Sequence, residues 1–197
     1  MKFFLMCLIL GFWLNLNATQ LMDAMKHGNL KIFKLLIDNG ADVNERAIVG
    51  GKPLDYAVSA GNVKMVKILI SKGAYGNYAV CNAAFNNDYK MVKLLIENGY
   101  SVHDSFAGDE PIEVAARKNN IKIVKFLIKN GAITEHSYSV SYLKNAIRGG
   151  YNMVKLMLDN GVNTNHIADK KKVLDYAIKR NNTSIIKLLM SRLKDTK

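Results

Sequence analysis

The sequence predicts an all-α fold, a solenoid of about six helix-turn-helix repeats joined by short β-hairpins or loops. The first observation is a recurring unit, which is clearest in residues 53–74 and in residues 110–134. Each unit reads as a short helix, a tight turn, a longer apolar helix and a closing glycine. The second observation is that the closing glycines recur every 26 to 33 residues, a period typical of stacked repeats. These glycines are Gly40, Gly73, Gly99, Gly131 and Gly161.

Within each unit, the two helices differ in the side chains that they offer. The second helix carries apolar residues at helical spacing, and the first helix carries small residues that let neighbouring helices approach closely. The small residues are Ala24, Ala57, Ala83, Ala84, Ala115, Ala116, Ala146 and Ala177. A glycine or asparagine lies between the helices, where a left-handed backbone is expected: Gly28, Gly61, Asn87, Asn119, Gly149 and Asn181. The repeats are expected at residues 21–44, 52–77, 78–103, 109–134, 139–164 and 172–194.

Short motifs at the ends of the units connect them to a known family. Three units open with KPLDYA (52–57), EPIEVA (110–115) and KVLDYA (172–177), and the first unit closes with GADVN (40–44). With these motifs the chain resembles the ankyrin repeat family, whose repeats open with T-P-L-H-x-A and close with G-A-D-V-N. The resemblance implies paired antiparallel helices stacked side by side, with a loop or hairpin projecting from each junction. It also implies a concave groove between the projecting loops and the first helices.

The chain departs from the family pattern at several positions. The histidine of the opening motif is replaced by Asp55, Glu113 and Asp175, and a carboxylate in the first turn of a helix is favoured by the helix dipole. We therefore expect these carboxylates to be structural. Residues 73–84 leave little room for a hairpin before the third repeat, so we expect a gap in the row of hairpins. The first repeat lacks the opening motif and the sixth lacks the closing glycine, as expected of capping repeats.

Residues 1–18 do not fit the repeats and predict a cleaved signal peptide. Lys2, the apolar run Phe3–Leu14 and a following small residue form its three parts. The apolar run is shorter than the roughly 20 residues of a transmembrane span, and an uncleaved N-terminal anchor is the alternative. Cleavage leaves residues 19–197 as a single domain that is exported, either to a periplasm or as a secreted protein. Cys81 is then the one remaining cysteine, and we expect it to be a small buried hydrophobe.

No catalytic motif accompanies the repeats. The sequence contains no glycine-rich phosphate loop, no G-x-S-x-G, no H-E-x-x-H and no paired cysteines. We therefore expect no enzyme activity, no cofactor and no small-molecule substrate. His103, His136 and His166 fall in successive junctions, where a metal site and solvent-exposed loop histidines are the alternatives. The second is favoured because no i,i+4 spacing supports a metal site.

The formal net charge of +12 is divided between two kinds of position. Six lysines fall in register on the second helices, where we expect a solvated surface: Lys34, Lys67, Lys93, Lys125, Lys155 and Lys187. The residues that end each first helix are expected to line the groove instead. The candidate partner-binding residues among them are Lys26, His27, Phe85, Arg117, Lys118, Ile147, Arg148, Lys179 and Arg180. The junctions add Ile48, Val49, Phe106 and Tyr138.

These residues predict a non-enzymatic scaffold that binds another protein through its groove and hairpin tips. The cations concentrate in the last three repeats, which favours an acidic partner. One alternative is a secreted factor that binds a host protein. Another is a protein that binds an anionic polymer or a membrane surface through the basic C-terminal groove. Nucleic acid is disfavoured by export and by the lack of regular aromatic platforms. We expect a monomer.

Overall fold

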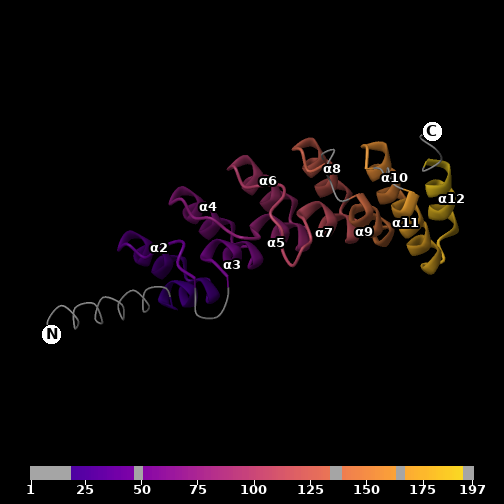
Figure 1. The fold of residues 1–197 in the computed structure, drawn as a ribbon. Coiled ribbons are helices and arrows are strands. Elements are labelled where there is room, and N and C mark those ends of the chain that lie inside the picture. Colours follow the sequence, from indigo (N-terminus) through magenta and orange to yellow (C-terminus); the bar gives the residue numbers. More distant parts are fainter. Residues whose placement is uncertain (1–18, 47–50, 134–138, 163–166, 193–197) are drawn as a thin grey trace, which may run out of the picture.

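The computed structural model describes residues 19–46, 51–133, 139–162 and 167–192, which form a stack of six helix pairs (Figure 1). The first pair consists of residues 19–26, which are helical, and of α2 (Leu30–Asp38). The other pairs are α3 (Pro53–Ser59) with α4 (Val63–Ser71), α5 (Ala79–Phe85) with α6 (Tyr89–Glu97), α7 (Pro111–Arg117) with α8 (Ile121–Lys129), α9 (Ser139–Gly149) with α10 (Tyr151–Asp159), and α11 (Ile167–Lys179) with α12 (Thr183–Arg192). The predicted all-α solenoid is confirmed.

The helices form two rows that run from the N-terminal to the C-terminal end of the stack (Figure 1). The first helices α3, α5, α7, α9 and α11 pack successively against one another. The second helices form the other row, in which α2 packs against α4, α6 against α8, and α10 against α12. One continuous apolar core lies between the rows and includes Leu54, Leu95, Leu127 and Met157. Each repeat therefore packs mainly against its neighbours, as expected of a solenoid.

The small residues of the first helices are buried, as predicted. All eight alanines are 5 % exposed or less, so that their helices meet across single methyl groups. The closest approach is at Gly149 on α9. A Cβ added there would overlap the carbonyl oxygen of Ala116 on α7 and lie 3.2 Å from its carbonyl carbon. The contact between α7 and α9 therefore requires glycine at this position.

The turns inside the repeats use the left-handed backbone that the sequence predicts, with one exception. The φ angles of Gly28, Gly61, Asn87, Asn119 and Asn181 lie between 55° and 67°. In the fifth repeat the prediction is wrong, because α9 continues through Gly149 and the turn is made by Gly150, whose φ is 105°. A glycine pair permits this shift. The first glycine packs against α7 while the second takes a backbone conformation that other residues avoid.

The junctions between repeats have unequal lengths. Residues 72–78 connect α4 to α5, which confirms the short junction predicted before the third repeat. The side chain of Asn44 holds this junction, donating to the carbonyl oxygen of Gly73 at 3.3 Å and accepting from the N–H of Tyr75 at 2.9 Å. In the described part of the chain, the one isolated β-bridge joins Phe106 and Asp109, in the longer connection between α6 and α7.

Two of the three carboxylates of the opening motif are buried at the interface with the following repeat. Asp55, in the first turn of α3, is 1 % exposed and accepts the N–H groups of Asn77 and Tyr78 at 3.1 and 3.2 Å. Burial raises the pKa of Asp55 above its usual value, and the two N–H donors act against this shift. The carboxylate therefore holds the next junction in place, in addition to lying at a helix N-terminus.

The equivalent prediction for Asp175 is wrong. This residue is exposed and lies well inside α11, because α11 begins at Ile167. Asp175 is therefore neither in a first turn nor at a repeat interface. The helix begins earlier than the KVLDYA motif indicated, so the motif marks a helix N-terminus in the second and fourth repeats only.

The predicted signal peptide lies outside the described residues. Among the described helices, none is long and apolar enough to cross a lipid bilayer.

Candidate partner-binding groove

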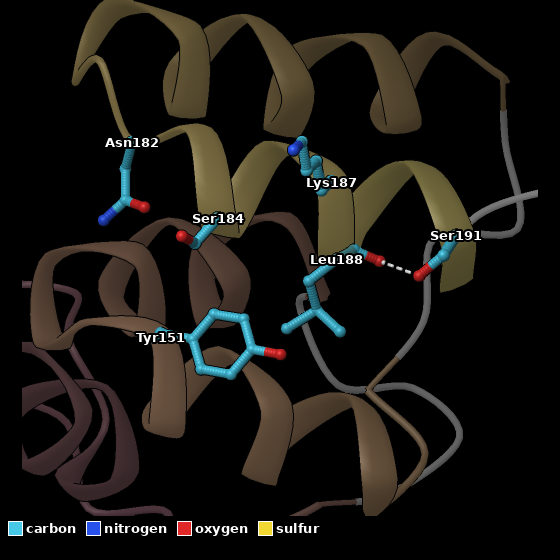
Figure 2. A pocket seen from close by; sticks show the side chains of 6 residues that line it. All are labelled: Tyr151, Asn182, Ser184, Lys187, Leu188 and Ser191. Atoms are coloured by element: carbon cyan, nitrogen blue, oxygen red, sulfur yellow. Dashed lines mark hydrogen bonds between the residues drawn. The ribbon is translucent and has the colours of Figure 1, made fainter.

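Among the hollows on the described surface, one lies on each row of helices. The hollow on the second helices has a volume of about 630 Å³ and lies between α10 and α12 (Figure 2). Its polar groups serve the helix itself, since Asn182 accepts the N–H of Ile185 at 3.1 Å and Ser191 donates to the carbonyl oxygen of Leu188 at 2.8 Å. None of the predicted groove residues lines it. This hollow is therefore the weaker candidate for a binding site.

The other hollow lies on the first helices and has a volume of about 460 Å³. Residues from α3, α5, α7 and the Phe106–Asp109 turn line it: Ser59, Cys81, Asn82, Phe85, Asn86, Phe106, Ala107, Asp109, Val114 and Arg117. The two phenylalanines are 57 % and 52 % exposed, although large apolar side chains usually lie in the core. We call this feature the Phe hollow. Its volume lies in the range of roughly 300–1,000 Å³ of ligand pockets, and its apolar lining suits an apolar side chain.

Both phenylalanines of the Phe hollow are held by neighbouring groups. The ring of Phe106 packs against that of Tyr78, with 4.8 Å between the ring centroids. Two backbone hydrogen bonds of 3.0 Å between Phe106 and Asp109 fix the turn that carries the Phe106 ring. The ammonium group of Lys118 lies 3.7 Å from the centroid of the Phe85 ring, in a cation–π contact. The walls of the Phe hollow are therefore preformed.

Arg117 is not the free cation that the sequence predicts. Its guanidinium group forms an ion pair with Asp109 at 2.6 Å, and both side chains are 32 % exposed. The pair lies on the wall of the Phe hollow. The charge on this wall is therefore balanced.

Three cations of the last two repeats gather around one tyrosine. Lys144, Arg148 and Arg180 lie 5.9, 5.8 and 5.7 Å from the centroid of the Tyr176 ring. Arg148 also donates from Nε to the Tyr176 hydroxyl at 2.6 Å. Among the described residues, none of the three cations forms an ion pair with a carboxylate. We call these four residues the Tyr176 cluster, and its positive charge is open to an anionic partner.

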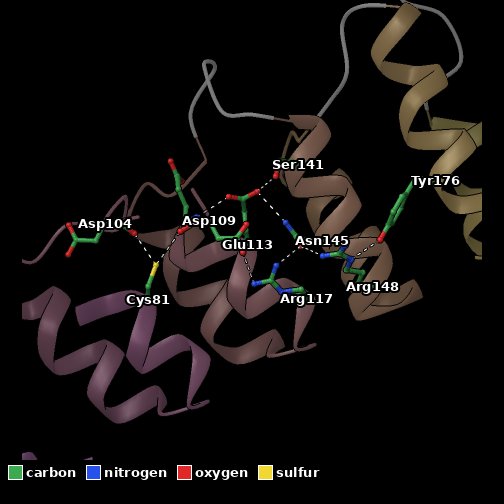
Figure 3. Close-up of polar contacts among 10 residues, drawn as sticks. Cys81, Asp104, Asp109, Glu113, Arg117, Ser141, Asn145, Arg148 and Tyr176 are labelled. Carbon is green, nitrogen blue, oxygen red and sulfur yellow. Dashed lines mark hydrogen bonds and ion pairs between the residues drawn. The ribbon is translucent and has the colours of Figure 1, made fainter. Parts of the chain in front are cut away.

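Asn145 connects the Phe hollow to the Tyr176 cluster (Figure 3). Its side-chain oxygen lies 3.5 Å from a guanidinium nitrogen of Arg117 and 3.5 Å from one of Arg148. Its amide nitrogen donates to Glu113 at 3.2 Å, and Glu113 also accepts from Ser141. Asn145 is 5 % exposed, so this contact lies at the base of the groove. The two features therefore lie along one line of first helices.

The remaining predicted residues are more scattered. Ile147 is wrong as a groove residue, because it is 4 % exposed and belongs to the core. Since α9 stays helical through Gly149, Ile147 turns inward and Arg148 turns outward. Lys26 and His27 are exposed at the opposite end of the stack, and Lys179 is exposed at the end of α11. Ile48, Val49 and Tyr138 lie outside the described residues.

The sequence reasoning missed Tyr176 and Asn145. A signal for Tyr176 was present, because Lys144 and Arg148 are four residues apart on one first helix and Tyr176 and Arg180 are four apart on the next. Residues at this spacing share a helix face, so two such pairs on adjacent helices can meet. No comparable pattern marks Asn145. The six lysines predicted to form a solvated surface on the second helices are all exposed.

The histidines are not arranged for metal binding in the part of the chain that the structure describes. His103 has one acidic side chain close by, because its Nδ1 lies 3.2 Å from Glu110. No group of three His, Cys, Asp or Glu side chains in the described ranges could hold a metal ion. His136 and His166 lie outside these ranges.

Cys81 is buried, as predicted, and is 2 % exposed at the back of the Phe hollow. Its thiol lies 3.1 Å from the carbonyl oxygen of Asp104 and 3.4 Å from that of Asp109. Burial raises the pKa of Cys81 to about 12.

We expect the Cys81 thiol of the folded protein to react with a thiol reagent near neutral pH at least a hundredfold (~10²) more slowly than that of the protein in urea, because the thiolate is the nucleophile. Mass spectrometry of the labelled peptide checks this. Equal labelling at Cys81 in both states would contradict it.

Asp104 is expected to make the free energy of unfolding depend on pH. Burial, and secondarily the charge of Asp55, raise the pKa of Asp104 from 3.8 to about 6. Between these values the folded state holds a proton that the unfolded state has released, so the free energy of unfolding falls as pH rises. We expect Asp104→Asn to reduce this slope and to stabilise the protein above about pH 6. Part of the slope should remain because Asp55 is shifted in the same direction. Urea denaturation across this range checks the prediction, and an unchanged slope would contradict it.

Comparisons with known proteins agree with this architecture. A family model described as ankyrin repeats (3 copies) matches residues 4–80 and 74–140, and the first match begins inside the predicted leader. The crystal structure of the human ASB11 ankyrin repeat domain is 24 % identical in sequence with a TM-score of 0.69, covering 90 % of this chain and 85 % of that one. At this identity the likeness concerns the fold alone. No curated relative matches the sequence. The chain belongs to the ankyrin repeat family.

Proposed function

We propose that the protein is a non-enzymatic scaffold that binds another protein through the groove along its first helices. Ankyrin repeats are typical protein–protein interaction modules and are generally non-enzymatic. The observation that carries the proposal is the Phe hollow, where two half-exposed phenylalanines line a concave surface on the same row of first helices as the cations of the Tyr176 cluster. Aromatic anchors with a charged rim are the usual anatomy of a protein-binding surface.

The groove is well suited to binding because it is already ordered. Side-chain amides join successive first helices to one another. Asn82 donates to the carbonyl oxygen of Asp55 at 3.3 Å, and Asn86 donates to that of Ser59 at 3.0 Å. A preordered surface loses little conformational entropy on binding, so more of the contact energy is available for affinity.

The proposal is tested by reversing the charge of side chains on one row of helices at a time. We expect the variant with Lys118, Lys144, Arg148 and Arg180 changed to glutamate to lose at least tenfold (~10×) of the partner retained by the parent protein in pull-downs from envelope extract, because these side chains lie at Phe85 and at the Tyr176 cluster. The matched control changes Lys67, Lys125, Lys155 and Lys187 to glutamate, which alters the net charge equally on the second helices. Equal loss in both variants, or in neither, would contradict binding through the groove.

We further propose that the protein is exported after cleavage of residues 1–18. The charged start, the apolar run and the small residue that follows support this. Fractionation of producing cells, followed by N-terminal sequencing, tests it. A chain that begins near Thr19 in the periplasm or medium supports export, and a destination in the medium favours a host protein as partner. A full-length chain in the membrane supports the anchor, and one in the cytosol contradicts export.

The Tyr176 cluster supports one second function, which is binding to an anionic polymer or membrane surface. Its three cations lack ion-pair partners among the described residues. Binding to a polyanion releases counterions, so the affinity would fall steeply with salt concentration. Retention of one protein at both low and high salt would instead support the scaffold.

A further inference from the structure

We propose that the groove recognises a two-part segment of its partner, with an apolar side chain in the Phe hollow and carboxylates at the Tyr176 cluster. This inference rests on the proposed function and specifies the partner's chemistry. In an extended segment the two parts would lie roughly six residues apart. The proposal follows from the difference in chemistry between the two ends of the groove and from the distance between them.

The Phe hollow favours an uncharged apolar group. Its two phenylalanines are exposed to solvent in the unbound protein, so covering them with an apolar side chain removes apolar surface from water. Its charged wall is already neutralised by the ion pair between Arg117 and Asp109. A carboxylate placed here would compete with Asp109 for Arg117 and would repel the carboxylate of Asp109. The residues that line the hollow therefore offer no unpaired cation to an acidic side chain.

The Tyr176 cluster favours the opposite chemistry. Three cations surround one ring, and none of the ion pairs among the described residues includes any of the three. Carboxylates from a partner would relieve the repulsion among these cations. The guanidinium of Arg148 is already oriented by its bond to the Tyr176 hydroxyl, which leaves its other donors fixed in space. A fixed guanidinium fork matches the two oxygens of a carboxylate.

The spacing follows from the stack. The Phe hollow lies between α5 and α7, and the Tyr176 cluster lies between α9 and α11, two helices further on. Packed helices lie roughly 8–10 Å apart, so the two features are separated by roughly 20 Å. An extended chain covers about 3.3 Å per residue, and about six residues span this distance. Arg117, Asn145 and Arg148 follow one another along this path (Figure 3).

A protein segment fits these two features better than a uniform polyanion does. A polyanion could neutralise the Tyr176 cluster but would leave the Phe hollow uncovered. A purely apolar segment would fill the Phe hollow but would leave three cations unpaired. A segment that carries both groups at the right separation uses both features at once, and linking the two contacts raises the overall affinity well above that of either alone.

Selection from random peptides tests the proposal. Phage-displayed random peptides of about 16 residues, long enough to hold both groups in an extended chain, are selected on the purified protein. The protein is taken as it accumulates in cells that express the full sequence, and the salt concentration is about 0.15 M. We expect the enriched peptides to share a large apolar residue and at least two acidic residues roughly six positions away. Halving this separation in a synthetic peptide should weaken binding about tenfold, because the linker no longer spans both features.

Three variants show which part of the groove selects which group. Phe85→Ser with Phe106→Ser should remove the apolar preference and leave the acidic one. The variant with Lys144, Arg148 and Arg180 changed to alanine should remove the acidic preference and leave the apolar one. The control variant changes Lys67, Lys125 and Lys187 to alanine, which removes the same number of cations from the second helices and should leave both preferences unchanged. All of the substituted side chains are at least partly exposed, and helical content by circular dichroism checks that each variant is folded.

The other outcomes separate the two proposals. Peptides that depend on the groove variants but lack the predicted spacing would overturn the two-part rule and leave groove binding intact. Peptides that bind all variants equally would overturn both proposals, because they would lie elsewhere on the protein. Enrichment of acidic residues alone would overturn the two-part rule in favour of a polyanion site. No enrichment by the parent protein would overturn the two-part rule, because the library contains segments of both kinds.

Discussion

Replacing Gly149 by alanine is expected to lower the free energy of unfolding by about 3 kcal/mol, the upper part of the range for overpacking a close contact. The new Cβ would overlap the carbonyl oxygen of Ala116 and lie 3.3 Å from the Cβ of Met153. The first of these atoms belongs to the backbone of α7, so it cannot move aside as a flexible side chain could. The helices α7 and α9 would have to separate along part of their contact. Urea denaturation followed by circular dichroism measures the loss.

This result would be informative because helix propensity predicts the opposite sign. Gly149 is the last residue of α9, and alanine is favoured over glycine in a helix by up to about 1 kcal/mol. Gly161→Ala provides the comparison, since a Cβ there meets nothing within 4 Å and only the φ of 88° is unfavourable. That strain should cost about 1–2 kcal/mol. A rise in the stability of Gly149→Ala would mean that α7 and α9 lie further apart than the structure shows.

Glu113→Ala is expected to destabilise the stack by about 3 kcal/mol, because buried donors lose a charged acceptor. Glu113 is 3 % exposed and accepts from Ser141 and from the amide of Asn145, both on α9. It also accepts the N–H of Glu110 at 2.9 Å, as part of a capping box at the start of α7. The substitution therefore removes a helix cap and a link between the fourth and fifth repeats. Thermal denaturation should show a fall in Tm of about 10 °C.

Asp175→Ala is the matched control, because Asp175 occupies the same place in the opening motif. It is exposed inside α11, and a surface substitution of this kind usually changes stability by less than about 0.5 kcal/mol. The sequence alone gives these two carboxylates the same role, whereas the structure gives them different ones. Similar losses for both variants would show that the motif position itself, rather than contact with the next repeat, determines the effect.

The repeat architecture could be predicted from sequence because its causes are local. A closing glycine needs a left-handed backbone, and an alanine in a first helix needs a close neighbour, and both requirements recur in every repeat. The φ angles of the closing glycines, between 74° and 88°, and the burial of the alanines follow from these requirements. The exposed Phe85 was also predictable, because its groove position can be counted from Asn87 in the turn, whereas Phe106 was predicted from its place in a junction.

The errors arise where two repeats must be placed relative to each other. Counting from Gly149 assigned Ile147 to the groove, but the second glycine moved the turn by one residue and rotated the end of α9. The Tyr176 cluster combines side chains from α9 and α11, so no single repeat contains its pattern. The pairing of Arg117 with Asp109 depends on how the turn before α7 folds back over the groove. These features are tertiary, and a single sequence records them only indirectly.

The short reach of the contacts has a consequence for how the chain folds as it is synthesised. Helices pack mainly within their own repeat or against the next one. Among the described hydrogen bonds, the widest separation in sequence is 36 positions, between Asn120 and Ala84. Contacts of such short range form quickly, and folding can start in any adjacent pair of repeats and spread outward. The first repeats can therefore become structured while the last ones are still being translated, and each new repeat finds its packing partner already in place.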